Sequence, residues 1–396
     1  MGYPTTYPED CDPAYSHNHT NNAWYAYTWF YTRDEIRTFT YGLPLVLIIC
    51  LLGNGSFLFV VARCKRLHTN TNVYLACLAM TDVSYVLTSV GPYLQAFYDS
   101  PVRHDIPYNA FIGCTLSFGS AYGLYFTSIG LVTLVSFERY YAICLPLKHR
   151  AISSRRRTRA LILTTFLIGL ILGFTRALKY SRLQRYCVIW PQLPDFAEWP
   201  QKVEFCVSVN DSVGLNLFTE LLDTLPFFIA LLWNGYMYAR IVYTLSNRPL
   251  IGKNGDASSS SGQTRLQIQA FQIRNQVARV LIINGCLFFL CQIWVRFNYI
   301  NNILTTTLGV KLYPSEAVYG VMLVFGRCML YVNSSLNPFV YILTSSYYRD
   351  AYKEVLYGRM FDCATCRREE LIKSTERSRV VSVVDVSSQN HTDSRL

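Results

Sequence analysis

Several charged side chains of this sequence lie inside long apolar stretches, where they are costly. Asp82, Glu220, Asp223, Arg296 and Arg327 are each surrounded in sequence by mainly aliphatic and aromatic residues. Charged residues at membrane depth face a cavity or one another, and they mark sites of binding or transport. Carboxylates and guanidinium groups in this setting would recognise a ligand by charge and hydrogen bonds. The alternative is that they only neutralise one another between packed helices.

These charges are not accompanied by a catalytic arrangement. The sequence contains neither an H-E-x-x-H nor a G-x-S-x-G motif, which would indicate a metalloprotease or a serine hydrolase. The sequence therefore predicts a protein that is not an enzyme. A transporter or channel also places charges at membrane depth, but the sequence has no internal repeat of the kind common in transporters.

The elements that must position these side chains are seven apolar blocks. Hydrophobic residues make up 51% and charged residues 15% of the 396 positions. A block of about 20 apolar residues crosses the roughly 30 Å hydrocarbon core as a helix, and a helix satisfies its own backbone groups there. The predicted fold is an all-α integral membrane protein, a seven-transmembrane helix bundle, with spans at 40–63, 72–97, 111–143, 158–178, 213–246, 270–305 and 315–343.

Basic residues in the short loops predict how the bundle is oriented. Lys and Arg accumulate in cytoplasmic loops, and the loop after the third span is basic without any acid: Lys148, Arg150, Arg155, Arg156, Arg157 and Arg159. The net charge of +11 therefore indicates membrane topology rather than nucleic-acid binding. The sequence predicts a multi-pass plasma-membrane protein with an extracellular N-terminus over residues 1–39, a bundle over 40–343 and a disordered cytoplasmic tail over 361–396.

Residues 344–360, between the bundle and the tail, predict a short interfacial eighth helix that lies on the lipid bilayer. Apolar residues recur there at helical spacing, with charged residues on the other face: Tyr347, Tyr348, Ala351, Tyr352, Val355 and Leu356. Cys363 and Cys366 follow this helix, and we expect them to be palmitoylated. The alternative is two inert thiols.

Four cysteines fall in segments predicted to be extracellular, namely Cys11, Cys114, Cys187 and Cys206. An even number of cysteines in an oxidising compartment predicts two disulfides. Asn18 and Asn210 begin N-x-[ST] sequons on the same side, so both are predicted glycosylation sites.

The motifs of these spans, in their order, resemble those of the rhodopsin-like (class A) G-protein-coupled receptors. The resemblance covers about residues 40–360 and includes Glu-Arg-Tyr at the end of the third span and Asn-Pro-x-x-Tyr in the seventh. The residues that carry it are Gly53, Asn54, Leu78, Ala79, Asp82, Cys114, Glu138, Arg139, Tyr140, Leu225, Pro226, Phe227, Asn337, Pro338 and Tyr341. It implies a receptor that activates heterotrimeric G proteins by a shift in conformational populations and that recruits arrestin.

The resemblance implies a sodium pocket in the middle of the bundle. Its residues are here Asp82, Ser128, Asn333, Ser334 and Asn337. A lone buried carboxylate is costly, and a bound Na⁺ or a proton on Asp82 removes that cost. Bound Na⁺ is expected to favour the inactive conformation, and no other cofactor is predicted.

The resemblance also implies an activation switch. Arg139 is expected to pair with Glu138, and Ile129, Pro226 and Phe288 to form a bistable packing cluster. Pro338 removes a backbone hydrogen bond and loosens the seventh helix. The full set of switch residues is Glu138, Arg139, Tyr140, Ile129, Pro226, Phe288, Gln292, Pro338 and Tyr341.

The sixth span departs from the family pattern. Gln292 occupies the position of a rotating Trp, and Trp294 occupies the position of the Pro that kinks the helix. Without Pro, the kink is smaller or has another cause, so basal activity could be altered in either direction.

The family also implies how the cysteines pair. Its third-span cysteine, here Cys114, pairs with a cysteine of an extracellular loop. Cys206 lies 20 residues before Pro226 and Cys187 lies 39 residues before it, and the shorter spacing fits the family better. This implies a Cys114–Cys206 bridge and leaves Cys11–Cys187 as a second pair.

The residues in the predicted extracellular half of the bundle, compared with those of the family, indicate the class of ligand. The family's amine receptors need an Asp where this chain has Ala121, and its opsins need a Lys where it has Tyr331. The charged and aromatic residues there resemble the pockets of receptors for small amidated neuropeptides, and Asp223 is expected either to pair with Arg296 or to receive a basic ligand group. The predicted ligand-binding residues are Tyr122, Tyr125, Glu220, Asp223, Arg296 and Arg327.

The predicted function is thus a G-protein-coupled receptor that binds an extracellular ligand, a short neuropeptide, amidated or not. The alternatives are an orphan or constitutively active receptor for a non-peptide ligand and, in another class, a membrane transporter.

Overall fold

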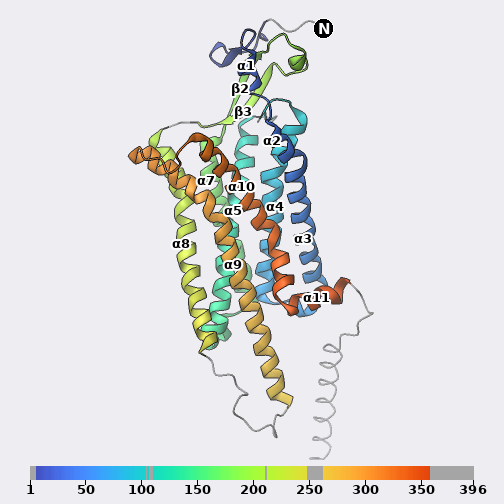
Figure 1. Cartoon of the computed structure of the whole chain (residues 1–396). Coiled ribbons are helices and arrows are strands. Elements are labelled where there is room, and N and C mark those ends of the chain that lie inside the picture. Colours follow the sequence, from blue (N-terminus) through green and yellow to red (C-terminus); the bar gives the residue numbers. More distant parts are fainter. Residues whose placement is uncertain (1–5, 104, 107–109, 210–211, 248–261, 357–396) are drawn as a thin grey trace, which may run out of the picture.

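A computed structural model describes residues 6–103, 105–106, 110–209, 212–247 and 262–356. Figure 1 shows a bundle of long helices with a small cap at its N-terminal end. The predicted disordered tail 361–396, the predicted palmitoylation sites Cys363 and Cys366, and the sequon at Asn210 lie outside the described residues.

Within the described chain, seven helical segments are long and apolar enough to cross a membrane, which confirms the predicted bundle. Six of them are formed by α4 (Asn70–Asp99), α5 (Ala110–Cys144), α7 (Arg155–Ala177), α8 (Val213–Ser246), α9 (Gly262–Leu308) and α10 (Glu316–Thr344). At the N-terminal ends of four of these helices, a hydroxyl side chain accepts a hydrogen bond from a backbone N–H group that has no partner within the helix. These residues are Thr69 for α4, Ser154 for α7, Ser212 for α8 and Ser315 for α10.

The remaining span begins earlier than predicted. It consists of α2 (Arg33–Arg37), a π-helical turn η2 (Thr38–Gly42) and α3 (Leu43–Arg63), and it counts as one continuous span over Arg33–Arg63. Thr32 starts it with a capping box: Glu35 N donates to Thr32 Oγ1 at 3.3 Å, and Thr32 N donates to Glu35 Oε2 at 2.9 Å. This motif stabilises a helical start outside the apolar block.

Glycines let two helices of the bundle approach closely. Gly119 and Gly123 of α5 face Gly169 and Gly173 of α7, and a Cβ added at Gly173 would meet the backbone of Gly123. Both pairs have the G-x-x-x-G spacing that brings membrane helices together. The α5–α7 interface is accordingly the most extensive helix contact of the described chain.

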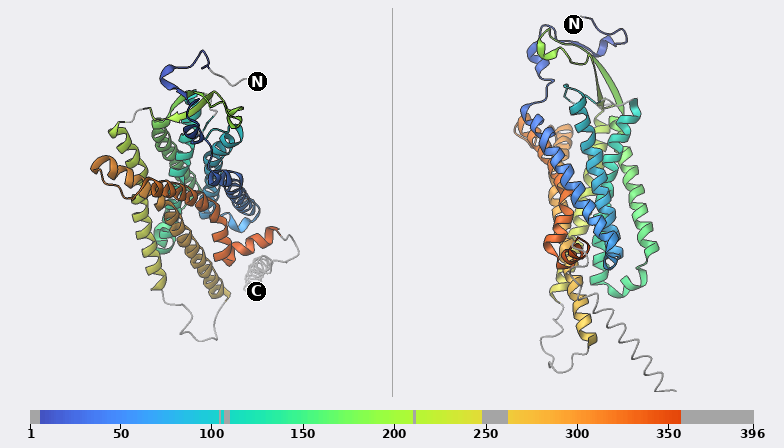
Figure 2. Two further views of the ribbon diagram at one scale, coloured as in Figure 1. Left: turned by 45° about the horizontal axis from the view of Figure 1, so that its top comes forward. Right: turned by 90° about the vertical axis from the view of Figure 1, so that its right-hand side faces the viewer.

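The opposite end of the bundle carries short elements. They are η3 (Lys65–Leu67), α6 (Pro146–Ile152) and α11 (Ser346–Leu356). Helix α11 follows α10 directly and buries Tyr348, Ala351 and Tyr352 against the bundle, in agreement with the predicted eighth helix. Figure 2 shows α11 across this end, with α9 projecting beyond it.

The cap contains a small sheet that the all-α prediction did not include. Strand β2 (Arg182–Ile189) pairs with β3 (Lys202–Val207) as an antiparallel hairpin. The N-terminal strand β1 (Ser16–Asn18) pairs with β2 in parallel, with Ser16 opposite Cys187. Short helices complete the cap: η1 (Pro13–Tyr15), α1 (Ala23–Tyr27), η4 (Leu178–Tyr180) and η5 (Pro194–Phe196).

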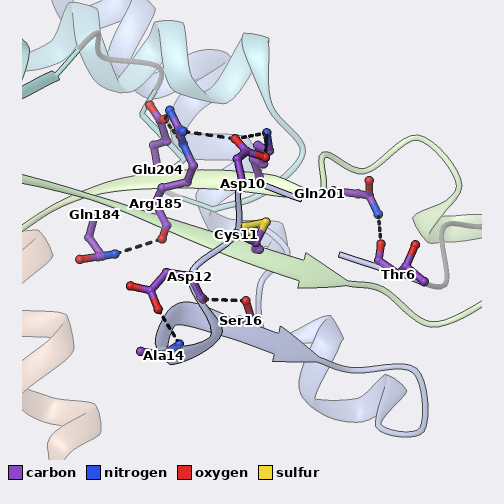
Figure 3. The surroundings of a disulfide bond; sticks show 12 residues. Thr6, Asp10, Cys11, Asp12, Ala14, Ser16, Gln184, Arg185, Gln201 and Glu204 are labelled. Atoms are coloured by element: carbon purple, nitrogen blue, oxygen red, sulfur yellow. Dashed lines mark hydrogen bonds and ion pairs between the residues drawn. A yellow bond between two sulfur atoms is a disulfide. The ribbon is translucent and has the colours of Figure 1, made fainter. Parts of the chain in front are cut away.

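A disulfide and ion pairs attach the N-terminal segment to the hairpin. Cys11 bonds to Cys187, and Figure 3 shows the polar contacts around Cys11. Asp10 pairs with Lys202 at 2.7 Å and with Arg185 at 3.9 Å. The hydrogen bond from Lys202 lowers the pKa of Asp10. Because these pairs are exposed, the covalent link contributes most of the attachment.

Aromatic side chains form a separate core inside the cap. Trp190, Phe196 and Trp199 lie in the connection between β2 and β3, and they are buried together with Ala26 of α1. Phe30 packs edge-on against Trp199, with ring centroids 4.3 Å apart. The cap is thus a packed unit in its own right rather than a set of loops.

Candidate functional site

All six predicted ligand-binding residues line one cavity of about 350 Å³ at the cap end of the bundle. Tyr122 and Tyr125 come from α5, Glu220 and Asp223 from α8, Arg296 from α9 and Arg327 from α10. A cavity of this size is within the range of small-molecule and short-peptide sites. That the six contact a ligand stays a prediction.

A fifth charged residue of the cavity, Arg176 of α7, was not predicted. Its Nε lies 2.5 Å from Asp223 Oδ2, and both side chains are almost fully buried. The guanidinium also lies over the Tyr122 ring, 4.9 Å from its centroid. The signal was present in the sequence, because Arg176 falls inside the fourth apolar block, near its end.

The expected ion pair between Asp223 and Arg296 is therefore wrong. Arg296 donates a hydrogen bond from Nη1 to the backbone carbonyl oxygen of Asp223. The side-chain carboxylate of Asp223 accepts a hydrogen bond from Arg176 instead. The Arg296 guanidinium is enclosed by rings instead, at 4.8 Å from the centroids of both Tyr125 and Tyr299. Cation–π contacts offset part of the cost of burying it.

Arg327 differs from the other two guanidinium groups. Its side chain remains accessible to solvent, and it lies 6.0 Å from the Tyr93 ring centroid. No carboxylate forms an ion pair with it in the described part of the chain. An accessible cation inside the cavity can attract carbonyl or carboxylate oxygens of a ligand.

A second chamber of about 430 Å³ adjoins this cavity. Tyr180, Glu220, Asn302 and Tyr319 line both spaces. The outer chamber is lined mainly by amide, hydroxyl and charged side chains, which suit the polar backbone of a peptide.

Deeper in the bundle, part of the predicted sodium pocket is assembled. Asn337 Nδ2 donates to the buried Asp82 Oδ2 at 2.5 Å, and Ser334 also contacts this carboxylate. Ser128 and Asn333 are buried on the neighbouring helices α5 and α10. The oxygen atoms of these side chains are of the kind that bind Na⁺, a hard cation.

At the opposite end, the expected pairing of Arg139 with Glu138 is replaced by other contacts. Glu138 Oε1 lies 2.9 Å from His149 Nε2 of α6, and Arg139 donates to Thr71 Oγ1 of α4. Adjacent residues of one helix point in different directions, and each finds its partner on a neighbouring element. Both line a cavity of about 380 Å³ at this end.

The other switch residues lie in the central core. Ile129 and Phe288 belong to one buried cluster, whereas Gln292 is buried with Oε1 lacking a hydrogen-bond partner among the described residues. Pro226 and Pro338 lie inside continuous helices. The ring of Tyr140 faces that of Tyr236. The centroid of the Tyr341 ring is 5.0 Å from that of Phe57.

The structure confirms both expected disulfides. Cys114 of α5 bonds to Cys206 of β3, and Cys11 bonds to Cys187 of β2. Asn18 is exposed, and its Oδ1 accepts a hydrogen bond of 2.6 Å from Thr20 of the same sequon.

Known proteins resemble this chain over most of its length. The family model "7 transmembrane receptor (rhodopsin family)" matches residues 53–341. The chain is 24% identical to the thyrotropin-releasing hormone receptor of Ovis aries, over 89% of this chain and 85% of the relative. It is also 24% identical to the neuromedin-U receptor 1 of Homo sapiens, over 79% of this chain and 71% of the relative. The neuromedin U receptor homolog nmur-2 of Caenorhabditis elegans is 25% identical over 79% and 77%.

The matched range contains more than half of the chain, from the first span to Tyr341 of the seventh. Together with the seven membrane-length helices, it agrees with the prediction of a membrane receptor rather than an enzyme. The chain belongs to the rhodopsin family of seven-transmembrane receptors.

Proposed function

We propose that this receptor binds a short extracellular peptide in the cavity at the cap end and activates heterotrimeric G proteins. The observation that carries the proposal is the cavity itself, where three guanidinium groups, two carboxylates and several tyrosines surround one space that continues into a polar outer chamber. Peptides supply carbonyl oxygens, amide donors and charged ends for such groups. The relatives are receptors for thyrotropin-releasing hormone and neuromedin U.

The mechanism is a shift of populations. A peptide that binds one conformation more tightly raises the share of that conformation by its difference in affinity. In the favoured state the cavity around Arg139 opens to a G-protein segment. Na⁺ at Asp82, with Ser128, Asn333, Ser334 and Asn337, would favour the other state, and the switch residues would repack between the two.

The topology follows from the basic loops. The cap end and the N-terminus lie outside the cell, and α11 and the tail lie inside. Asn18 and Asn210 then carry glycans, Cys363 and Cys366 carry palmitate beside the bilayer, and the Ser- and Thr-bearing tail recruits arrestin once it is phosphorylated.

The test is expression in cultured cells and challenge with short neuropeptides, both amidated and free-acid forms, with calcium and cyclic AMP read in parallel. We expect a saturable response that Arg139→Ala abolishes without loss of surface expression. Arg327→Ala should reduce peptide potency, because it removes the accessible cation. Unchanged potency in both Arg327→Ala and Glu220→Gln would exclude the ligand role of the cavity.

A second candidate is a constitutively active receptor. In the sixth span, Gln292 replaces the family's rotating Trp and Trp294 replaces its kink-forming Pro. Gln292 Oε1 is buried without a hydrogen-bond partner among the described residues. High basal signal without any added peptide, abolished by Arg139→Ala, would favour this candidate.

A further inference from the structure

The connection between α6 and α7, at the end of the bundle opposite the cap, contains two serines in a basic segment. They are Ser153 and Ser154. Arg150 lies three residues before Ser153. Arg155 and Arg156 lie two and three residues after it, and all three arginines are exposed. The proposed topology places this segment inside the cell, where protein kinases and ATP are present.

The spacing of the arginines suits a serine kinase that selects basic substrates. The substrate groove of such a kinase carries carboxylates, and guanidinium groups on both sides of the serine bind them through charge-assisted hydrogen bonds. The segment from Lys148 to Arg159 contains no acid that would repel the groove. Three residues before Ser154 the chain has Ala151 instead of an arginine. The pattern therefore favours Ser153 over its neighbour.

The segment can open far enough to enter a kinase. Helix α6 has seven residues and buries none of them, and a helix of this length is marginal without packing. Ser153 is half-buried, and its Oγ accepts a hydrogen bond of 3.1 Å from Asn70 Nδ2. Unwinding α6 therefore exposes Ser153 at the cost of few contacts, chiefly this bond and that of His149 with Glu138. Local opening of this kind does not require global unfolding.

Ser153 also lines the cavity of about 380 Å³ that contains Arg139. The charged side chains that line it among the described residues are Glu138, Arg139 and Arg150. Glu138 lies against His149, and two guanidinium groups outnumber the one carboxylate. A phosphoserine carries roughly 1.5 to 2 negative charges and three acceptor oxygens, which guanidinium groups bind in bidentate pairs. A phosphate on Ser153 would therefore match this cavity in charge and in hydrogen bonding.

We propose that Ser153 is a phosphorylation site through which an arginine-directed serine kinase prevents coupling to the G protein. Ser153 Oγ attacks the γ-phosphorus of ATP in the kinase. The new O–P bond replaces the bond from that phosphorus to the oxygen that bridges to the β-phosphate, ADP leaves, and the hydroxyl proton passes to a carboxylate of the kinase. The phosphate then binds Arg139 and Arg150 and fills space that the proposed mechanism reserves for a G-protein segment. This inference rests on the proposed function and adds a control from inside the cell.

The first measurement maps the modification. The purified full-length receptor is incubated with ATP and protein kinase C, a kinase that selects serines flanked by basic residues, and mass spectrometry locates the phosphate. We expect phosphate on Ser153. Arg150→Gln should slow its phosphorylation by about tenfold, the effect of one lost charge-assisted hydrogen bond. Arg63→Gln is the charge-matched control, because Arg63 is also exposed but ends α3 outside the segment. It should keep the full rate.

The second measurement reads coupling. Kinase-treated and untreated receptor are each reconstituted with a heterotrimeric G protein, without arrestin, and nucleotide exchange is measured with and without the short neuropeptides named above. Treatment should lower exchange by about tenfold or more, as expected when a hydrogen-bonded cation is lost to the partner. Ser153→Ala, compared with its own untreated sample, should show no such loss. Ser154→Asn keeps a good N-cap for α7 and cannot be phosphorylated there, so it should respond like wild type.

The outcomes separate this inference from the proposed function. Absence of phosphate on Ser153, while the kinase modifies a reference peptide, would overturn the site. Phosphate on Ser153 with unchanged exchange, or an equal loss of exchange in Ser153→Ala, would overturn its effect on coupling. A folded, untreated receptor that promotes no exchange would overturn the proposed function and that effect with it, whereas the phosphate map would still decide whether Ser153 is modified.

Discussion

At the residue scale, the buried ion pair of Arg176 and Asp223 joins α7 to α8. Removing one partner leaves an uncompensated charge, at a cost of about 3–5 kcal/mol. We therefore expect Arg176→Met and Asp223→Leu each to lower the free energy of unfolding by about this amount. The double variant should recover most of the loss, since an apolar pair carries no charge. Denaturant unfolding of the purified receptor measures this.

The exposed pair of Lys311 and Glu316 provides the comparison. Their side chains are 61% and 79% exposed, and pairs of this kind contribute about 0–1 kcal/mol. Lys311→Met should therefore leave unfolding almost unchanged. A loss in this variant as large as in Arg176→Met would contradict the assignment of the effect to burial.

His19 makes the stability of the cap depend on pH. Its ring is buried among Tyr25, Trp29 and Trp190 and stacks on His17 at 5.9 Å. Burial, with a smaller effect of His17, lowers its pKa below the ordinary value of 6.5. Below pH 6.5 the unfolded ring binds a proton more readily than the folded ring. Its contribution to stability is therefore complete above that pH and is lost as the pH falls toward the folded pKa.

Hydrogen exchange of residues 23–30 at about pH 7.4 and about pH 5.5 measures this loss, after correction for the intrinsic exchange rate. The cap should exchange faster at the lower pH. His19→Phe keeps an aromatic ring and should remove the difference. A pH response of equal size in wild type and His19→Phe would assign it to another group.

The candidate site was predictable from residue types to a large extent. Asp82, Glu220, Asp223, Arg296 and Arg327 were found because a charge in an apolar block needs a partner or a cavity. Their partners were not predictable in the same way, because a partner depends on side-chain direction across helices. Asp223 thus pairs with Arg176 rather than Arg296, and Glu138 pairs with His149 rather than its neighbour Arg139.

At the element scale, the close approach of α5 and α7 depends on glycine. A Cβ at position 173 would lie against the backbone of Gly123, which has no side chain to rotate away. Gly173→Ala must therefore push the helices apart, and we expect it to cost about 1–3 kcal/mol, the usual cost of overpacking. Thermal or denaturant unfolding of the purified receptor measures the loss.

Gly55 of α3 is the matched control. A Cβ there meets nothing within 4 Å, and Ala is a better helix former than Gly by about 1 kcal/mol. Gly55→Ala should therefore be neutral or slightly stabilising. If Gly173→Ala behaves like Gly55→Ala, the two helices are not held at the distance that the glycines allow.

The helices were predictable as elements because each one is encoded in a single apolar block. The sheet of the cap was not. Strand β1 has three residues and pairs with β2 about 170 residues later, from Ser16 to Cys187, so no local pattern indicates the pairing. The G-x-x-x-G spacings at Gly119 and Gly169 were readable in the sequence but do not show which helix faces which.

At the scale of the whole molecule, the Cys11–Cys187 disulfide attaches the N-terminal segment to the cap hairpin across 176 residues of chain. Cys11→Ser combined with Cys187→Ser should destabilise the cap by roughly 2–5 kcal/mol. The bundle should keep its melting temperature, since the cap has its own core. Faster hydrogen exchange confined to the cap residues is the expected observation.

Cys286→Ser serves as the control for this pair, because Cys286 is a free, exposed cysteine of α9. It should change neither exchange nor melting. A melting temperature of the bundle that falls with loss of Cys11 and Cys187 would mean that cap and bundle unfold as one unit.

The pairing of Arg176 with Asp223 also has a consequence for synthesis of the chain. Because α7 precedes α8 in the chain and is synthesised first, we expect Arg176 to enter the membrane before its partner is available. An arginine near the middle of a span costs about 2.5–3.5 kcal/mol during insertion, and less near the end, where Arg176 lies. The span over Arg155–Tyr180 offsets this with a mean hydropathy of 2.0 in its apolar window. We therefore expect the ion pair between α7 and α8 to form during biogenesis, once α8 brings the carboxylate of Asp223 into the membrane.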